Sequence, residues 1–217
     1  MWGLLAFFAK LAAVVPPLQL LAMTFFIGGL TGLCTWPFRP GAARVLLQLP
    51  WQVWMLYVGG LFGCHLLYFL AVRNAPVVEV SLIAYLWPLF IVLFSAFLPG
   101  GKLLWNHVVG AALGFGGAFI VISKGQSFTF ANGLQLGHLV ALPYAILWAG
   151  FSVSIRKHGA IATDSVVGFC MASAILAGMA HGMLETSLWS FLPAQWFAII
   201  GLGLLPMGAL FTRGISG

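Results

Sequence analysis

Residues 79–88 read Glu-Val-Ser-Leu-Ile-Ala-Tyr-Leu-Trp-Pro, and they lie inside the apolar segment Pro76–Leu98. An acid, a tyrosine, a tryptophan and a proline therefore fall at the depth of a lipid bilayer, where lipid offers polar atoms no hydrogen-bond partner. Polar groups persist at that depth when they face a cavity or another helix. The stretch thus predicts a transmembrane helix that forms one wall of a pathway through a membrane.

The composition of the whole chain agrees with a membrane location. Its 217 residues are 62% hydrophobic and only 6% charged, and the mean hydropathy is +1.09, whereas a soluble domain carries about 25% charged residues. The net charge of +6 comes from basic residues scattered between apolar runs, without a basic patch. We therefore expect an integral membrane protein whose partners are the lipid bilayer and a small-molecule substrate, with no nucleic acid and with its oligomeric state left open.

The apolar segments predict an all-α, polytopic membrane helix bundle. A membrane span needs about 20 apolar residues. Eight segments meet or approach that length, the first being short: Trp2–Val15, Leu18–Trp36, Trp51–Val72, Pro76–Leu98, Asn106–Ser123, Leu134–Ile155, Ser165–Leu184 and Gln195–Thr212. Prolines, glycines and polar capping residues separate them.

The basic residues predict the orientation of these spans. If the N-terminus lies in the cytoplasm, only Arg73 and Lys124 fall on the outer side. The cytoplasmic side then receives six bases, as the positive-inside rule requires: Arg39, Arg44, Lys102, Arg156, Lys157 and Arg213.

A short pattern recurs and predicts an internal repeat. Trp2 stands eight residues before Lys10, and Trp148 stands eight before Arg156, an offset of 146 residues. The same offset carries the second and third spans onto the seventh and eighth. We therefore expect one repeat of five spans at residues 1–123 and an incomplete second repeat at 134–217. Because five is odd, the second copy has inverted topology, as in secondary transporters.

The repeat also predicts that the counterparts of the fourth and fifth spans would lie beyond Gly217. We therefore expect a ten-helix protein of which this chain carries eight helices. A natural eight-helix protein is the alternative. Small residues four apart, Gly28 with Gly32 and Gly110 with Gly114, predict close helix packing.

The residues that carry a family resemblance lie in four spans. They are Trp2-Gly3 with Lys10 and Pro16-Pro17, the stretch Glu79 to Pro88, Gly110 to Gly117, and Trp148. With these, the chain resembles the drug/metabolite transporter superfamily of EamA type, and most closely its aromatic amino acid exporter (YddG-like) branch. The resemblance implies a secondary exporter of a bacterial inner membrane, with a central cavity between two repeats and alternating access.

Aromatic side chains at span depth are the candidate substrate-binding residues. An interior indole either hydrogen-bonds a neighbour or faces a cavity, which makes Trp87 and Trp148 candidates, and Trp2 joins them as the repeat counterpart of Trp148. Tyr144 lies four residues before Trp148 and therefore on the same helix face. Such a lining favours amphiphilic solutes with a ring or a long apolar chain. The sparse charge at span depth argues against a multiply charged substrate such as a nucleotide, and the resemblance implies amino acids or similar metabolites.

Two further pairs lie three residues apart on one helix face. His65 with Tyr68 lies on the third span, and Tyr85 with Pro88 lies on the fourth. His65 either hydrogen-bonds a neighbouring helix or meets a substrate. Pro88 leaves a carbonyl one turn earlier without its donor and bends the helix, which makes a gate plausible.

Two charged residues are candidates for gating or coupling. Glu79 either pairs with Arg73 across a short turn or takes part in proton coupling. Lys10 either reaches outward to the interface or meets a substrate carboxylate.

Two other classes of protein compete with the exporter. A membrane-embedded enzyme needs convergent catalytic groups or metal ligands, but the five histidines lie in five different segments. We expect no catalytic residues, metal or cofactor. A non-transporting fragment, or a partner that completes its fold with another chain, is the second alternative.

Overall fold

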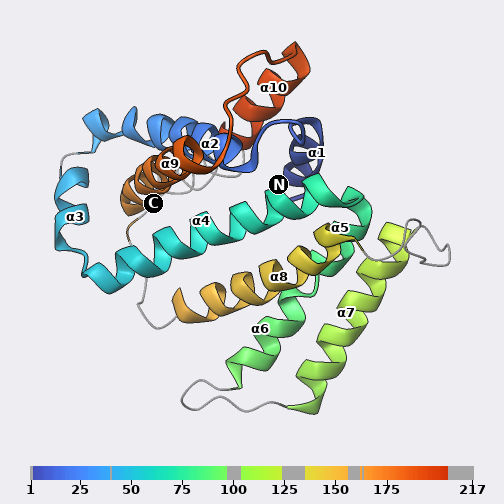
Figure 1. The fold of residues 1–217 in the computed structure, drawn as a ribbon. Coiled ribbons are helices and arrows are strands. Elements are labelled where there is room, and N and C mark those ends of the chain that lie inside the picture. Colours follow the sequence, from blue (N-terminus) through green and yellow to red (C-terminus); the bar gives the residue numbers. More distant parts are fainter. Residues whose placement is uncertain are drawn as a thin grey trace. The chain divides into compact units, whose positions relative to one another are not determined.

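The computed structural model describes residues 2–39, 41–96, 104–123, 135–155, 162 and 164–204. Within these ranges the chain is helical and contains no strand. The elements are α1 (Trp2–Leu11), α2 (Pro17–Leu33), the 3-10 helix η1 (Trp36–Phe38), α3 (Ala42–Gln48), α4 (Trp51–Asn74), α5 (Val77–Ala84), α6 (Trp87–Ser95), α7 (Trp105–Ser123), α8 (Leu136–Ile155), α9 (Asp164–Leu184) and α10 (Pro193–Leu202) (Figure 1). The predicted all-α bundle is confirmed.

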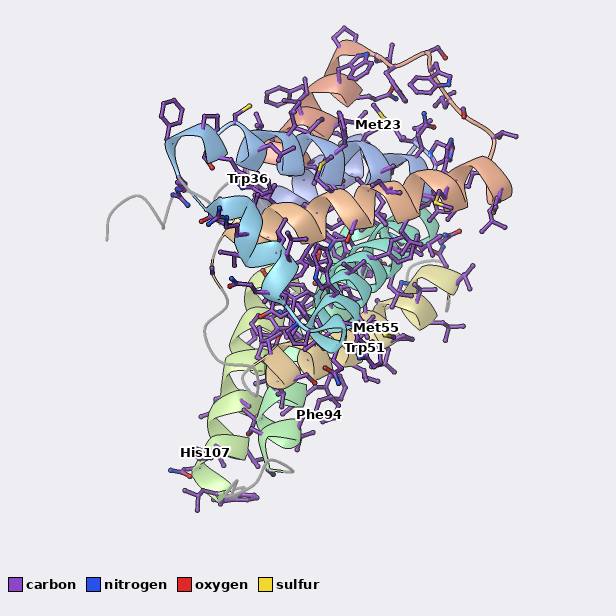
Figure 2. All side chains as sticks on the ribbon, turned by 90° about the vertical axis from the view of Figure 1, so that its left-hand side faces the viewer. Met23, Trp36, Trp51, Met55, Phe94 and His107 are labelled. Atoms are coloured by element: carbon purple, nitrogen blue, oxygen red, sulfur yellow. The ribbon has the colours of Figure 1, made fainter. Side chains whose placement is uncertain are left out.

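Five described stretches are long and apolar enough to cross a membrane: Pro17–Phe38, Trp51–Asn74, Val77–Ser95, Leu136–Ile155 and Asp164–Leu184. The helices α1 and α10 have 10 residues each, and the later part of the expected span Gln195–Thr212 lies outside the described residues. Trp51 and Met55, one turn apart on α4, are 66% and 64% exposed (Figure 2). Apolar side chains exposed on membrane-crossing helices suit contact with lipid.

Prolines set several helix boundaries. Pro17 and Pro193 are the first residues of α2 and α10, where a missing N–H removes no helical hydrogen bond. Pro88 lies in the first turn of α6 and divides the expected fourth span into α5 and α6. Proline cannot donate to the Ala84 carbonyl four residues earlier, so the helix stops there. The interruption between α5 and α6 lies where the sequence predicted a bend at Pro88.

The described chain forms two compact units. The first takes in Met1–Leu66 and His158–Gly217. Its centre is the pair α2 and α9, which pack along each other, with α1 and α10 packed together and α3 against α9 (Figure 1). Its core contains fully buried side chains from three helices, among them Phe25, Phe169 and Ile199.

The second unit takes in Leu67–Lys157. Here α8 packs against α5 and α6, and α7 packs against α6 and α5. Gly137 brings α8 close to the end of α4, because a Cβ at Gly137 would lie 2.5 Å from the Cβ of Ala75 and nearer still to the Ala71 carbonyl oxygen.

The glycine pattern predicts packing correctly at only some positions. Gly28 and Gly32 are buried in α2, and the neighbouring Gly29 faces Met171 of α9. At Gly110 and Gly114, however, no atom of the described residues lies within 4 Å of an added Cβ. The expectation of close packing there is wrong, because four-residue spacing also places small residues on a face that no described helix covers.

Candidate functional site

Four aromatic rings come together in the second unit, from α4 and α8. Tyr68 lies 5.3 Å from Tyr144 between ring centroids, Tyr144 stacks on Trp148 at 6.4 Å, and Phe151 meets Trp148 edge-on at 6.0 Å. We call Tyr68, Tyr144, Trp148 and Phe151 the aromatic cluster. Tyr68 and Tyr144 are buried, whereas Trp148 is half-buried.

Polar atoms border the aromatic cluster on the side of α5. Ser81 of α5 and Tyr85, which follows that helix, lie near Tyr68. Tyr85 ends α5 and is 37% exposed. Rings with hydroxyl groups at one edge can stack on an aromatic solute and hydrogen-bond its polar end.

The sequence-predicted residues Tyr68, Tyr85, Tyr144 and Trp148 are therefore neighbours. Phe151 was missed, although it stands three residues after Trp148 and so on the same helix face. Trp87 and Pro88 begin α6 and are half-buried. Trp87 and Pro88 stand two and three residues after Tyr85, so the break between α5 and α6 comes directly after a residue near the aromatic cluster.

His65 contacts a different helix. Its ring is buried, packs edge-on against Phe25 of α2 at 5.1 Å, and its Nδ1 lies 2.8 Å from the Leu61 carbonyl oxygen. The Nδ1–H group therefore donates to its own helix. The part of His65 in substrate binding stays a prediction.

Two other predicted residues lie at the start of the chain. The backbone of Trp2 begins α1, but its side chain lies outside the described residues. Lys10, in the last turn of α1, is exposed.

Glu79 forms a hydrogen bond with His138 of α8, and not the pair with Arg73 that was one of its two predicted roles. The Glu79 Oε2 and His138 Nε2 atoms are 2.6 Å apart, and the His138 side chain is 1% exposed. The Gln135 backbone N–H donates to Nδ1 at 2.9 Å, so Nε2 carries the ring proton and donates to the carboxylate. Sequence reasoning missed His138, because nothing local to either residue links positions 59 apart.

The other two acidic side chains of the chain also join helices. Asp164, the first residue of α9, accepts from Arg39 at 2.9 Å. Glu185, just after α9, accepts backbone N–H groups of α2 and contacts His181. Among the described residues no group of three or more His, Cys, Asp or Glu side chains could hold a metal ion.

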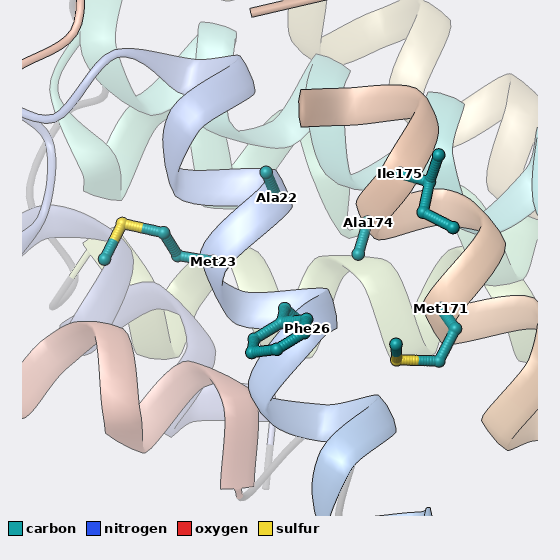
Figure 3. Close-up of a pocket in the computed structure, with 6 residues that line it drawn as sticks. All are labelled: Ala22, Met23, Phe26, Met171, Ala174 and Ile175. Atoms are coloured by element: carbon teal, nitrogen blue, oxygen red, sulfur yellow. The ribbon is translucent and has the colours of Figure 1, made fainter. Parts of the chain in front are cut away.

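An open groove lies between α2 and α9 in the first unit. It measures about 350 Å³ and is lined by Ala22, Met23, Phe26, Met171, Ala174 and Ile175, as Figure 3 shows. This lining offers no hydrogen-bond donor or acceptor from its side chains. The groove therefore suits apolar chains and not an amphiphilic solute.

Helices of this length and apolarity define an integral, multi-pass membrane protein. The sequence profile of the EamA-like transporter family matches residues 1–123. The chain is also 41% identical to the aromatic amino acid exporter YddG of Ancylobacter novellus, over 97% of this chain and 73% of the relative. The chain belongs to the EamA-like transporter family.

More distant similarity points to the same family. The chain is 28% identical to the pseudopaline exporter CntI of Pseudomonas aeruginosa, over 75% of this chain and 57% of the relative. A protein of solved crystal structure is 39% identical, with a TM-score of 0.70 over 96% of this chain and 75% of its own. The family profile and the named exporters to which the chain is similar are transporters.

Proposed function

We propose that the protein exports amino acids or similar amphiphilic metabolites, with aromatic amino acids as the expected substrates. The observation that carries this proposal is the aromatic cluster, in which Tyr68, Tyr144 and Trp148 follow one another at ring distances of 5.3 and 6.4 Å. The similarity to an aromatic amino acid exporter supports the same substrate class.

The proposed mechanism is alternating access of two inverted repeats, residues 1–123 and 134–217, around this cluster. The break between α5 and α6 at Tyr85 to Pro88 is the proposed gate. The N-terminus is proposed to lie in the cytoplasm and the protein in a bacterial inner membrane. Scarcity of charge at span depth supports a substrate with few charges, because a multiply charged solute would need counter-charges there.

Flux into proteoliposomes tests the function. Purified chain is reconstituted, and uptake of radiolabelled phenylalanine and tryptophan is measured against leucine, glutamate and protein-free vesicles. We expect aromatic amino acids to be transported fastest. If the protein is folded but flux is no greater than in protein-free vesicles, the result would favour the alternative of a non-transporting fragment, or of a chain that completes its fold with another chain. Chemical conversion of the solute would favour an enzyme.

Trp148→Ala tests the site within that function. An aromatic pair contributes about 0.5–1.5 kcal/mol beyond its buried area, so we expect substrate affinity to fall roughly 2- to 10-fold. Trp105→Ala is the matched control, because Trp105 is 80% exposed at the start of α7. Equal affinity of the Trp148 variant and the parent protein would remove Trp148 from the site.

A further inference from the structure

Two polar contacts hold the two ends of the α2–α9 pair. At one end, Glu185 accepts the backbone N–H groups of Leu18 and Gln19, in the first turn of α2, at 3.1 to 3.2 Å. At the other end, Arg39 donates to Asp164 at 2.9 Å. We call the first contact, with His181 and Ser187, the Glu185 clamp, and the second the Arg39 clamp.

The two clamps occupy equivalent positions in the proposed repeat. The offset of 146 residues carries Leu18 onto Asp164 and Arg39 onto Glu185. In the first copy these positions hold the donors, the Leu18 backbone N–H and the Arg39 side chain, and in the second copy both positions are acidic. Each end of the α2–α9 pair is therefore held by one carboxylate of the second copy.

Only the Glu185 clamp contains a histidine. The offset places Thr35 where the second copy has His181, and the Thr35 hydroxyl donates to the Gly32 carbonyl of its own helix at 2.7 Å. Arginine stays protonated at all physiological pH values, whereas histidine changes charge between pH 5 and 8. The two ends of the pair therefore differ in their sensitivity to protons.

The hydrogen bonds of His181 are compatible with both charge states. Its Nδ1 lies 2.9 Å from the Glu185 Oε2 atom, which already accepts from two backbone N–H groups, so Nδ1 donates. Its Nε2 lies 2.9 Å from the Ser187 Oγ atom. Nε2 accepts from the Ser187 hydroxyl in the neutral ring and donates to it in the imidazolium.

Protonation of His181 weakens the hold of Glu185 on α2. An imidazolium makes a stronger, charge-assisted bond to Oε2 and competes with the Leu18 and Gln19 N–H groups for that atom. It also adds positive charge beside the N-terminus of α2, where the helix dipole favours negative charge.

Other titratable groups near the pair are few among the described residues. Within α2 and α10 there is no charged side chain. Lys10 of α1 is exposed, and His65 of α4 contacts Phe25, two turns along α2 from the clamp. Arg39, Asp164 and Arg44 belong to the opposite end.

We propose that His181 and Glu185 form a proton-binding site whose occupation releases the first turn of α2 from α9. The site stands on the contacts above. A helix end that is released on protonation could serve a gated exporter. This use in transport rests on the proposed function.

Hydrogen–deuterium exchange tests the site without relying on transport. The full chain is studied in lipid nanodiscs from pH 8 to pH 5.5, with exchange rates corrected for their intrinsic pH dependence. We expect protection at Leu18 and Gln19 to fall roughly 2- to 5-fold on acidification, the range of a charge at a helix terminus. Amides at the start of α9, beside the Arg39 clamp, should keep their protection.

Variants identify the proton acceptor. His181→Asn keeps a neutral N–H donor in the Nδ1 position and should abolish the pH step. Glu185→Gln should show the low protection at pH 8 already, and His107→Asn, at the exposed start of α7 (Figure 2), should retain the step. Unchanged protection of the parent protein across this pH range, or a pH step that survives in His181→Asn, would overturn the proposal. Absence of flux in the vesicle assay with an intact pH step would instead refute the exporter.

Discussion

At the scale of single residues, the acidic side chains act as joints between helices. The chain has three Asp and Glu residues, and Glu79, Asp164 and Glu185 each contact a base or backbone N–H groups on another element. An unpaired carboxylate in an apolar environment is strongly unfavourable. Each of the three acids therefore has a partner. Their positions at helix ends keep the middle of the spans free of negative charge.

The Glu79–His138 pair leads to a prediction about stability. Glu79→Ala leaves the buried Nε2–H of His138 without this acceptor, which costs about 1–3 kcal/mol. Glu79→Gln keeps an acceptor oxygen and should be milder. Unfolding in mixed SDS micelles measures both, and a double-mutant cycle with His138→Ala isolates the pair. Additive effects of the two alanine substitutions would show that the pair contributes no coupling.

At the scale of elements, α8 both supplies three rings of the aromatic cluster and packs closely against α4. One part of the helix presents Tyr144, Trp148 and Phe151 as a row of rings, and its first turn approaches the end of α4 through Gly137. Pro143 lies inside this helix without ending it. The register of the aromatic cluster therefore depends on how closely α8 approaches α4.

Gly137→Ala tests that dependence. An added Cβ would lie 2.7 Å from the Ala75 backbone nitrogen, and overpacking of this kind costs about 1–3 kcal/mol. We expect a lower melting temperature and weaker substrate binding. Gly150→Ala on the same helix meets nothing within 4 Å and should be neutral or stabilising by up to about 1 kcal/mol. Equal melting temperatures of the two variants would contradict close α8–α4 packing.

At the scale of the whole molecule, the apolar surface and the positions of the basic residues set the relation to the membrane. Trp51, Trp105 and Trp189 are 66%, 80% and 70% exposed, and they lie at or beside helix ends, as tryptophans of the membrane–water interface do. Arg39 and Arg44 flank the short connection between α2 and α3. By the positive-inside rule, the two arginines support the proposed cytoplasmic side.

The orientation predicts which side a reagent must approach from. In a variant without Cys34, Cys64 and Cys170, a cysteine at Phe38, which is 85% exposed, should react only with a reagent on the cytoplasmic side. A cysteine at Leu192, which is 65% exposed, should react only from outside. A membrane-impermeant maleimide applied to whole cells and to inverted vesicles measures both. The reverse pattern would invert the topology.

Local features of the sequence predicted much of the fold and part of the site. Apolar length predicted the helical spans. Pro88 predicted an irregularity where α5 and α6 are separated, because a missing N–H acts within one helical turn. The four-residue spacing of Tyr144 and Trp148 predicted that they share a face, as their stacked rings confirm.

Long-range partners could not be predicted in this way. Closeness in sequence offered Arg73 as one of two predicted roles for Glu79, but His138 is its partner in the structure. The two packing positions expected at Gly110 and Gly114 are open. A periodic pattern shows that two residues share a face, but it does not show which helix that face meets.

The sequence by itself determined that this is a multi-pass helical membrane protein with aromatic residues at span depth, because apolarity, helical period and proline act over one or a few turns. The tertiary structure alone decided that Tyr68 meets Tyr144 and that Glu185 holds the first turn of α2 across 167 residues. Those contacts depend on which helices pack together, and packing is settled by shape and burial over the whole bundle.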